Sequence, residues 1–247
     1  MQIKDLLARS YALLGEENMQ TLHNTCAMVF GLGGVGGHCA EALARAGLKK
    51  LYLVDKDVVA ESNINRQLIA TVHSIGKPKT LLAKERLQAI NPFIELVEIQ
   101  AFYLPENPIP IPEDVDVVLD CIDTISAKIH IMQTCAARNI PMLSCMGMGN
   151  RTNPANITHT TLDKTQNDPL CKVMRKLAKE RGIQNVHVIY STEIPIKCNL
   201  SDTSNKATPG SLPFVPSVGG IHMAHAACEA VLKNRKQIIP KTTGKIQ

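Results

Sequence analysis

Aromatic side chains are scarce in this sequence: tryptophan is absent, and Phe, Tyr and Trp together make up 3% of the 247 residues. Apolar residues still reach 45%, so a sizeable core has to be built from Val, Ile, Leu, Ala and Met. We find no internal repeat and no low-complexity segment, which excludes a repeat array. The length predicts one large α/β domain, or one domain with extensions.

Paired cysteines are also missing. The chain has eight cysteines, but none of them form a C-x-x-C pair. Structural zinc sites are commonly built from such pairs, so the sequence predicts no zinc. Cys26, Cys121, Cys135 and Cys145 lie in or beside apolar runs, as buried thiols do, and this usage predicts a cytoplasmic location.

No stretch resembles a secretory signal or a membrane span. The N-terminal MQIKDLLARS carries charges within its first five residues. The most apolar candidate span, SVGGIHMAHAACEAVLK, contains two His and one Glu and is typical of an ordinary helix. We therefore expect no membrane span. The formal net charge of +5 is mildly basic, which is compatible with an RNA partner without indicating one.

Apolar runs alternate with helical patterns over the first 145 residues, which predicts a parallel sheet with crossover helices. After residue 150 the pattern changes, and we expect a sheet extension of the same domain. Strands are predicted at 26–31, 50–55, 94–100, 115–120, 140–145 and 186–190. Helices are predicted at 34–46, 77–90, 126–138, 168–181 and near 221–233, with a surface connection at 105–114, a mobile polar loop at 199–210 and a frayed basic tail.

The expected fold class is α/β: a Rossmann-like, mainly parallel sheet with an antiparallel extension in the second half. We treat residues 1–247 as one domain. Its expected parts are an N-terminal helical extension (about 1–25), a nucleotide-binding half (about 26–147), a substrate-side extension (about 148–235) and a basic tail (236–247).

A glycine-rich loop, GLGGVG, follows the first predicted strand and places Gly31, Gly33 and Gly36 in a G-x-G-x-x-G frame. The first glycine permits a tight turn, the second lets the backbone approach a phosphate, and the third lets the helix pack on the strand. The helix N-terminus adds free N–H groups. Asp55 follows Gly36 by 19 positions, near the offset at which an acid binds a ribose hydroxyl. The loop predicts nucleotide binding, but it does not choose between NAD and ATP.

Three further motifs make that choice. They are DKDVVAESNINRQ (55–67), GKPKT (76–80) and DCIDT (120–124). Together with the glycine loop they resemble the E1-like adenylating family, which includes the ThiF, MoeB and ubiquitin-activating enzymes. KTQNDPLCKVMRKLAKERGI, VIYSTEIPI and GSLPFVPSVGGI resemble one branch of it, the tRNA threonylcarbamoyladenosine dehydratases. This resemblance runs from about Arg9 to about Lys233 and implies the E1/ThiF adenylation fold.

The resemblance implies ATP and Mg²⁺ as cofactors. Adenylation brings two anions together, so the phosphates need cations, which Arg66 and Lys79 can supply. Asp123 is expected to hold Mg²⁺, whereas Asp120 is expected to be a structural acid. The family's N-terminal Arg aligns with Arg9, which implies a homodimer in which it reaches the neighbouring ATP site. The residues expected to bind the nucleotide are Gly31, Gly33, Gly34, Gly36, Asp55, Asp57, Asn63, Arg66, Gln67 and Lys79. Asp57 and Asn63 also have a simpler explanation as turn-capping residues.

The implied substrate is N6-threonylcarbamoyladenosine at position 37 of certain tRNAs. Its carboxylate would attack the α-phosphorus of ATP, and ring closure within the same side chain would then release AMP, with net loss of water. Lys172, Arg175, Lys176 and Lys179 are the expected tRNA contacts, although a solvated helix face is the commoner meaning of such a run. The sequence leaves open a sulfur-relay protein partner and a bound monovalent cation.

The sequence is compatible with three alternatives to different degrees. An NAD-dependent dehydrogenase would not need this phosphate machinery. An activator of a ubiquitin-like or sulfur-carrier protein would share the adenylation step, and Cys171 or Cys198 would then be the candidate thioester cysteine. The zinc pairs that are usual in MoeB and ThiF members are missing, which weakens this alternative. A scaffold that binds nucleotide without turnover would tend to lose Arg66 or Asp123, and both are present.

Overall fold

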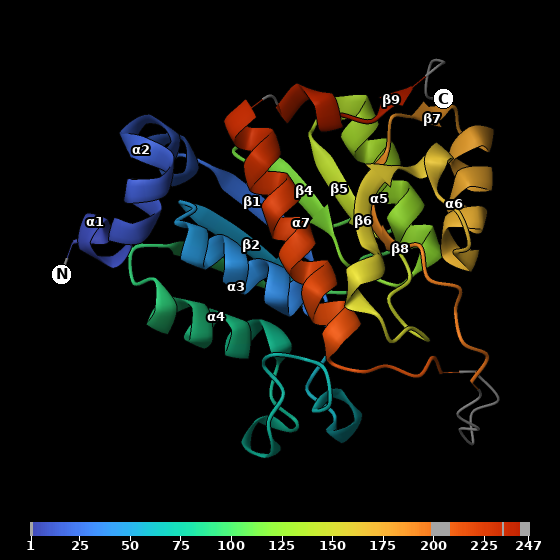
Figure 1. The fold of residues 1–247 in the computed structure, drawn as a ribbon, viewed down its shortest axis with the longest axis horizontal. Helices are drawn as coiled ribbons and strands as arrows, with labels where there is room; N and C mark the ends of the chain where they lie inside the picture. Colours follow the sequence, from blue (N-terminus) through green and yellow to red (C-terminus); the bar gives the residue numbers. More distant parts are fainter. Residues whose placement is uncertain (1, 199–207, 234, 243–247) are drawn as a thin grey trace.

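The computed structural model describes residues 2–198, 208–233 and 235–242. Within these residues the fold is built on a seven-stranded sheet with the strand order β3-β2-β1-β4-β5-β8-β6 (Figure 1). Neighbouring strands are parallel except β6 and β8, which pair antiparallel at one edge. The expected mainly parallel sheet with an antiparallel extension is therefore confirmed. The strands are β1 Cys26–Phe30, β2 Lys50–Val54, β3 Glu95–Ile99, β4 Val117–Asp120, β5 Met142–Cys145, β6 Ile157–Thr161 and β8 His187–Ser191.

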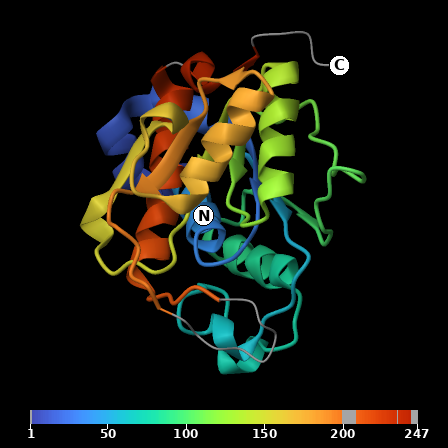
Figure 2. The same cartoon turned by 90° about the vertical axis from the view of Figure 1, so that its right-hand side faces the viewer.

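Helices cover both faces of this sheet. α2, α3, α4 and α7 pack on one face, and α5 and α6 pack side by side on the other (Figure 2). Alternate strand residues feed two cores: Val29 and Leu53 belong to the first, Met28 and Val118 to the second. Because both faces are covered, the central strands β1, β4 and β5 are buried along their whole length. The helices are α1 Ile3–Leu6, α2 Ala8–His23, α3 Gly36–Ala46, α4 Lys79–Ile90, α5 Ile125–Arg138, α6 Pro169–Glu180 and α7 Phe214–Lys233, with short 3₁₀ turns η1 Glu61–Asn63, η2 Val72–Ser74, η3 Pro154–Asn156, η4 Leu162–Lys164 and η5 Arg235–Ile238.

Local signals set the helix ends. α3 ends at Gly47, which takes the left-handed conformation at φ 88°, and α5 ends at Asn139 with φ 55°. α6 starts at Pro169 behind the N-cap Asp168, whose carboxylate accepts the N–H of Cys171 at 2.7 Å. Because these caps are written in the sequence, the bounds predicted for α3, α4, α5 and α6 lie within two residues of the observed ones.

The second half differs from expectation in three places. The short, largely polar strand β6 was not predicted. α7 begins at Phe214 rather than near Ile221, because Pro216 falls in its first turn, where a missing N–H is tolerated. The described part of the tail, up to residue 242, packs on the domain rather than fraying as expected. Its strand β9 (Lys241–Thr242) pairs with β7 (Ile183–Gln184), and Ile238 is buried.

Residues 199–207 of the expected mobile loop, and residues 243–247 of the tail, lie outside the described residues. Among the described helices, none combines the length and apolarity needed to cross a membrane.

Candidate functional site

The glycine loop joins β1 to α3 at the carboxyl end of the sheet. Gly31 has a φ of 86°, and a Cβ there would lie 2.9 Å from the carbonyl oxygen of Cys121. A Cβ at Gly36 would lie 1.7 Å from the carbonyl oxygen of Gly31, so only glycine lets α3 start this close to the strand. A Cβ at Gly33 would meet only the Gln67 amide, at 3.8 Å. The loop therefore holds its tight turn and leaves room in front of Gly33.

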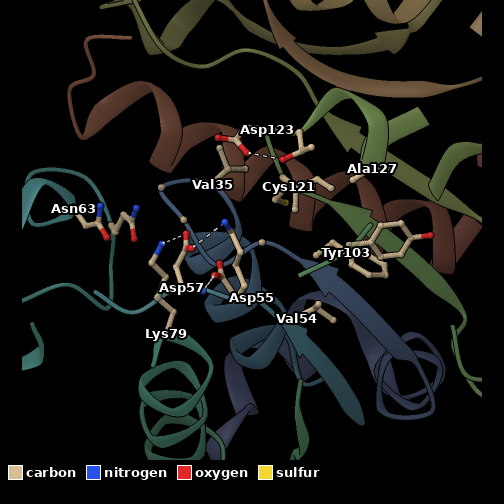
Figure 3. A pocket seen from close by; sticks show the side chains of 18 of the residues that line it. Val35, Val54, Asp55, Asp57, Asn63, Lys79, Tyr103, Cys121, Asp123 and Ala127 are labelled. Atoms are coloured by element: carbon tan, nitrogen blue, oxygen red, sulfur yellow. Dashed lines mark hydrogen bonds and ion pairs between the residues drawn. The ribbon is translucent and has the colours of Figure 1, made fainter. Parts of the chain in front are cut away.

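A pocket of about 450 Å³ opens beside this loop (Figure 3). It lies at the carboxyl ends of β1, β2 and β4, where open α/β sheets bind ligands. Gly36, expected as a nucleotide contact, is instead buried at the start of α3, outside the lining. The other expected nucleotide contacts line the pocket together with Asp123: Gly31, Gly33, Gly34, Asp55, Asp57, Asn63, Arg66, Gln67 and Lys79.

Asp55 fixes the shape of the glycine loop. Its carboxylate accepts the N–H of Leu32 at 2.7 Å and the N–H of Asp57 at 2.8 Å. The acid that follows β2 therefore ties the loop after β1 to its own loop, and it faces the pocket from there. Its expected role toward a ribose stays a prediction, now beside this structural role.

Lys79 is a buried cation at the pocket. Its side chain is 6% exposed, and its Nζ donates to the Asp57 carboxylate at 3.1 Å (Figure 3). The N–H of Lys79 also donates to the carbonyl of Asp57 at 3.0 Å. Asp57 thus holds the ammonium group in place at the start of α4, while its own carboxylate stays half exposed.

Asn63 is the last residue of η1, and Arg66 lies three residues after it. The Arg66 guanidinium donates to the carbonyl of Ser62 at 2.7 Å and to the side-chain oxygen of Asn65 at 2.9 Å, so its place in the wall is fixed. Asn63 accepts the N–H of Ala60 at 3.1 Å through its side-chain oxygen, which is the turn-capping role that was weighed for it. Both side chains also line the pocket.

Gln67 carries an unsatisfied oxygen. The residue is 8% exposed, and its Oε1 accepts no hydrogen bond from any described residue. Buried polar atoms are nearly always paired, so an orphan acceptor beside a pocket points to a donor on a ligand.

The two acids after β4 have different surroundings. Asp120 is fully buried and accepts from Lys128 Nζ at 2.9 Å and from the Ser144 hydroxyl at 2.5 Å, as a structural acid does. Asp123 is exposed at the pocket and accepts from the Thr124 hydroxyl at 3.5 Å (Figure 3). Sequence reasoning missed Lys128, although a lysine among apolar helix positions was a signal for a buried partner.

An apolar wall that the sequence did not reveal closes one side of the pocket. It includes Phe102 and Tyr103, and Lys56 Nζ lies 4.2 Å from the centre of the Phe102 ring. The Tyr103 hydroxyl is 2.8 Å from Nδ1 of His130. Burial raises the pKa of Tyr103 to about 12, so this wall stays neutral. Val54, Ala101 and Ala127 complete it.

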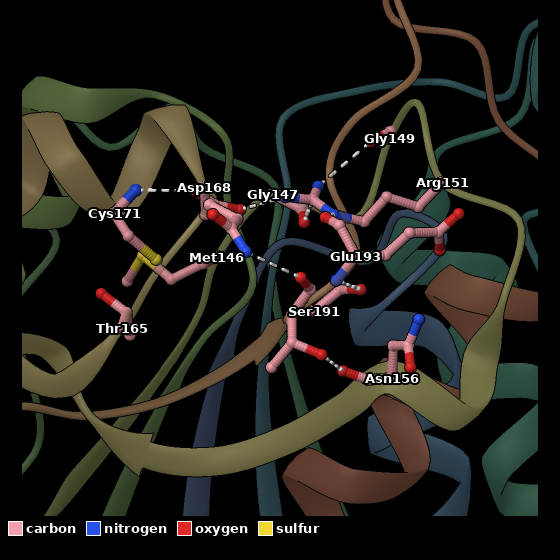
Figure 4. Close-up of polar contacts among 12 residues, drawn as sticks. Met146, Gly147, Gly149, Arg151, Asn156, Thr165, Asp168, Cys171, Ser191 and Glu193 are labelled. Atoms are coloured by element: carbon pink, nitrogen blue, oxygen red, sulfur yellow. Dashed lines mark hydrogen bonds and ion pairs between the residues drawn. The ribbon is translucent and has the colours of Figure 1, made fainter.

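A buried ion pair supports the crossing loop, residues 146–153, which passes over the other side of the pocket. Arg151 donates to the Asp168 carboxylate at 2.6 Å and to the carbonyl of Gly147 at 2.5 Å (Figure 4). It also donates to the carbonyls of Gly149 and Glu193, both at 3.2 Å. This residue, also missed from sequence, ties the crossing loop to the N-cap of α6 and to the segment after β8.

The two candidate thioester cysteines differ in access. Cys171 is fully buried, and burial raises its pKa to about 12, so it is a poor nucleophile. Cys198 is exposed, and its thiol donates to the side-chain oxygen of Asn150 at 2.8 Å.

The remaining expected residues lie outside the pocket lining. Arg9 is exposed on α2. One side of α6, on the sheet face opposite to α2, carries the four expected tRNA contacts: Lys172, Arg175, Lys176 and Lys179. Arg175 is half-buried because its guanidinium donates to the carbonyl of Thr165 at 2.8 Å, and Lys176 lies 3.9 Å from Glu180.

Comparison with known proteins gives a consistent picture. A model of the ThiF family matches residues 7–243. The tRNA threonylcarbamoyladenosine dehydratase of Bacillus subtilis is 39% identical over 240 residues, covering 92% of this chain and 94% of that protein. The enzyme of that name from Haemophilus influenzae is 32% identical over 235 residues, covering 89% of this chain and 90% of that protein.

Among solved structures, the crystal structure of E. coli tRNA N6-threonylcarbamoyladenosine dehydratase in complex with ATP has a TM-score of 0.82 and 27% identity to this chain. The match covers 93% of this chain and 94% of that chain. The complex of the same protein with AMP matches with the same TM-score, 0.82.

Proposed function

The chain belongs to the ThiF family, and on this premise we propose that it is an ATP-dependent adenylating enzyme that dehydrates N6-threonylcarbamoyladenosine at position 37 of tRNA. The observation that carries the proposal is convergence: four separate sequence motifs bring their polar residues to one pocket at the carboxyl end of the sheet. Relatives named for this reaction align over nearly the whole chain, which supports the same substrate.

The pocket suits a triphosphate. The positive end of the α3 dipole and the open space at Gly33 offer a site for phosphate oxygens. Lys79 and Arg66 add two cations whose positions are already fixed by Asp57 and Ser62. Charges fixed in advance stabilise a developing negative charge without reorganising during the reaction. The apolar wall at Phe102 would pack against the base.

Asp123 fits the expected magnesium ligand. Mg²⁺ bound with nucleotide phosphates uses only one or two protein carboxylates. Asp123 is exposed at the pocket, and in the described part of the chain no three His, Cys, Asp or Glu side chains gather into a metal site of their own. Asp123 would hold the ion, which would neutralise phosphate charge when bound.

The reaction needs no enzyme nucleophile. The threonyl carboxylate attacks the α-phosphorus, a carboxylate–phosphorus bond forms, and pyrophosphate leaves. A nucleophile in the same side chain then attacks the acyl carbon, the ring closes and AMP departs with the carboxylate oxygen. The tethered ends make this second step favourable. The burial of Cys171 fits a route without an acyl-cysteine.

The assembly is part of the proposal. We place Arg9 of one subunit at the other subunit's pocket, in a homodimer. Its exposure on α2, outside its own pocket, supports this arrangement. The basic side of α6 would contact tRNA, and the reaction would take place in the cytoplasm. A sulfur-relay partner and a monovalent cation stay expectations from the sequence, supported by nothing in the described residues.

Lys79→Ala tests the proposal. Removing one preorganised cation should lower ATP–pyrophosphate exchange with tRNA bearing N6-threonylcarbamoyladenosine by about 100- to 1000-fold. Mass spectrometry of the tRNA nucleosides should show loss of one water with the wild-type protein and not with the variant. Lys77→Ala is the matched control, because Lys77 is exposed two positions away.

Exchange that occurs only with a carrier protein, and never with this tRNA, would overturn the proposed substrate. Full exchange by Lys79→Ala would remove that residue from the phosphate site.

A further inference from the structure

A second groove, of about 840 Å³, lies at the opposite end of the sheet from the nucleotide pocket. Its walls come from η4, α6, β7, the residues before β8, and β9. In Figure 1, β7 and β9 lie at the top of the view, whereas the teal segment between β2 and α4 lies at the bottom. The groove is therefore separate from the site described above.

Cations line this groove. Lys164, Arg175, Lys179 and Lys241 contribute to it, and Asp163 is the one carboxylate among its described lining residues. Lys164, Lys179 and Lys241 form no ion pair within the described part of the chain. Unneutralised cations around a concave surface attract a polyanion.

The C-terminal segment builds one wall of the groove. Asn185 donates through its amide to the carbonyls of Gln237 and Ile239, at 2.9 and 2.8 Å. Gln184 pairs with Lys241 in the β7–β9 ladder. These contacts attach the C-terminal segment to the domain. They place Lys241 in the same groove lining as Lys179 of α6, so the C-terminal segment completes the basic surface.

The lining favours RNA over an acidic protein. Its apolar residues, such as Leu162, Ile183 and Val186, are each at most 4% exposed and form a floor. A protein partner would need exposed apolar anchors. The large exposed apolar side chains include Ile194, Ile196, Leu212 and Phe214, all outside this lining. Phosphates need only the cations on the rim.

The length of β8 matches that of a tRNA stem. Five residue steps lead from Val186 at the groove to Ser191 at the end of β8, near the crossing loop of the nucleotide pocket. At about 3.3 Å each, these steps span about 16 Å. Roughly five base pairs of an RNA helix, at about 3 Å each, cover the same distance. Nucleotide 37 lies in the anticodon loop, and the anticodon stem begins a few nucleotides away.

We propose that this groove binds the phosphate backbone of the anticodon stem while nucleotide 37 occupies the adenylation pocket. The inference rests on the proposed function for its choice of RNA. Lys179 on α6 and Lys241 on β9 contact the RNA phosphates from opposite walls of the groove, and Lys164 adds a third cation at its rim.

The test is Lys179→Glu/Lys241→Glu, with fluorescence anisotropy as the readout. Two labelled RNAs are used: an anticodon stem-loop bearing N6-threonylcarbamoyladenosine, and the loop oligonucleotide without its stem. We expect the Kd of the stem-loop to rise at least about tenfold and the slope of log K against log salt to fall by about 1.4–1.8 for two lost phosphate contacts. The Kd of the loop oligonucleotide should not change.

Lys49→Glu/Lys84→Glu is the control, because it makes the same change in net charge away from both sites, at exposed Lys49 and at partly exposed Lys84, which pairs with Glu98. It should leave both Kd values within twofold of wild type. If the reversed pair fails to melt like wild type, Lys179→Gln/Lys241→Gln replaces it, with an expected rise of about threefold.

Three results would overturn the assignment: an unchanged stem-loop Kd, an equal loss for the loop oligonucleotide, or an equal loss for polyglutamate, which would make the groove a general anion site. Failure of the proposed function has a different signature. The wild-type protein would then bind the stem-loop through the groove without removing water from the nucleoside.

Discussion

At the scale of single residues, the polar groups of the pocket differ in whether the chain itself supplies their hydrogen-bond partners. Asp55 receives two backbone N–H groups, and Lys79 has Asp57 as its partner. Gln67, by contrast, buries an acceptor without a donor. Such an atom costs about 1–3 kcal/mol of stability, and a hydrogen-bond donor on a bound ligand would offset this cost.

Replacing Gln67 by Met should therefore separate stability from binding. The variant keeps the side-chain volume and removes the orphan oxygen. We expect the free energy of unfolding to rise by about 1 kcal/mol and the KM for ATP to rise about tenfold, since one ligand hydrogen bond is lost. Urea unfolding and ATP–pyrophosphate exchange measure the two effects.

Gln20→Met is the control, because Gln20 is exposed on α2 and should change neither quantity. A less stable Gln67→Met protein with an unaltered KM would show that the oxygen serves the fold rather than the nucleotide.

At the scale of elements, the sequence predicted those helices and turns that are determined by residues close together in the chain. The turn after β1 and the caps at Gly47 and Asp168 are written in short motifs, and the helices they bound were predicted closely. β6 and β9 were missed, because each depends on a partner strand distant in the sequence.

The same division holds for the site. The motifs at 55–67 and 120–124 predicted residues that reach the pocket through their own strand ends. Lys128 and Arg151 could not be predicted, because their roles arise from buried pairing with Asp120 and Asp168 across the fold. Phe102 was not predicted for another reason. It follows β3 outside any recognisable motif, and it reaches the pocket only because of the strand order in the sheet.

The contact between α3 and α7 should make stability depend on pH. His38 is half-buried there, with Nε2 3.0 Å from the Ser217 hydroxyl. Burial lowers the pKa of His38 below its usual 6.5, while Glu41 opposes this shift and Arg86 adds to it. The folded protein thus holds fewer protons than the unfolded chain, so this stability is present above about pH 6.5 and is lost as the pH falls through the folded pKa.

We expect the free energy of unfolding to decline between about pH 7.5 and 5.5, and to decline less in His38→Gln, which retains an amide for Ser217. Urea titrations at several pH values measure the difference. His73→Gln should behave as wild type, because His73 is exposed. The same pH slope in wild type and His38→Gln would rule out this contact as the source.

At the scale of the whole molecule, the candidate functional cations lie in three regions. Arg66 and Lys79, the proposed phosphate contacts, lie at the carboxyl end of the sheet, the basic groove lies at the other end, and Arg9 lies on α2 away from both. A residue that serves the pocket from α2 can do so only in a second copy of the chain. A symmetric dimer would then carry two composite sites, each built from both subunits.

Mixing two inactive variants tests this arrangement. A dimer of one Arg9→Ala chain and one Asp123→Ala chain has one site with both residues intact if Arg9 acts in trans, and no intact site if it acts in cis. Random pairing of equal amounts should therefore restore about a quarter of wild-type ATP–pyrophosphate exchange. Co-expression with two tags, followed by exchange assays, measures the recovery.

Lys79→Ala mixed with Asp123→Ala is the control and should recover nothing, because both residues belong to one chain's pocket. No recovery in the Arg9 mixture would show that Arg9 does not act across the interface, and full exchange by Arg9→Ala alone would place Arg9 outside the reaction. Either result would require the composite site to be abandoned.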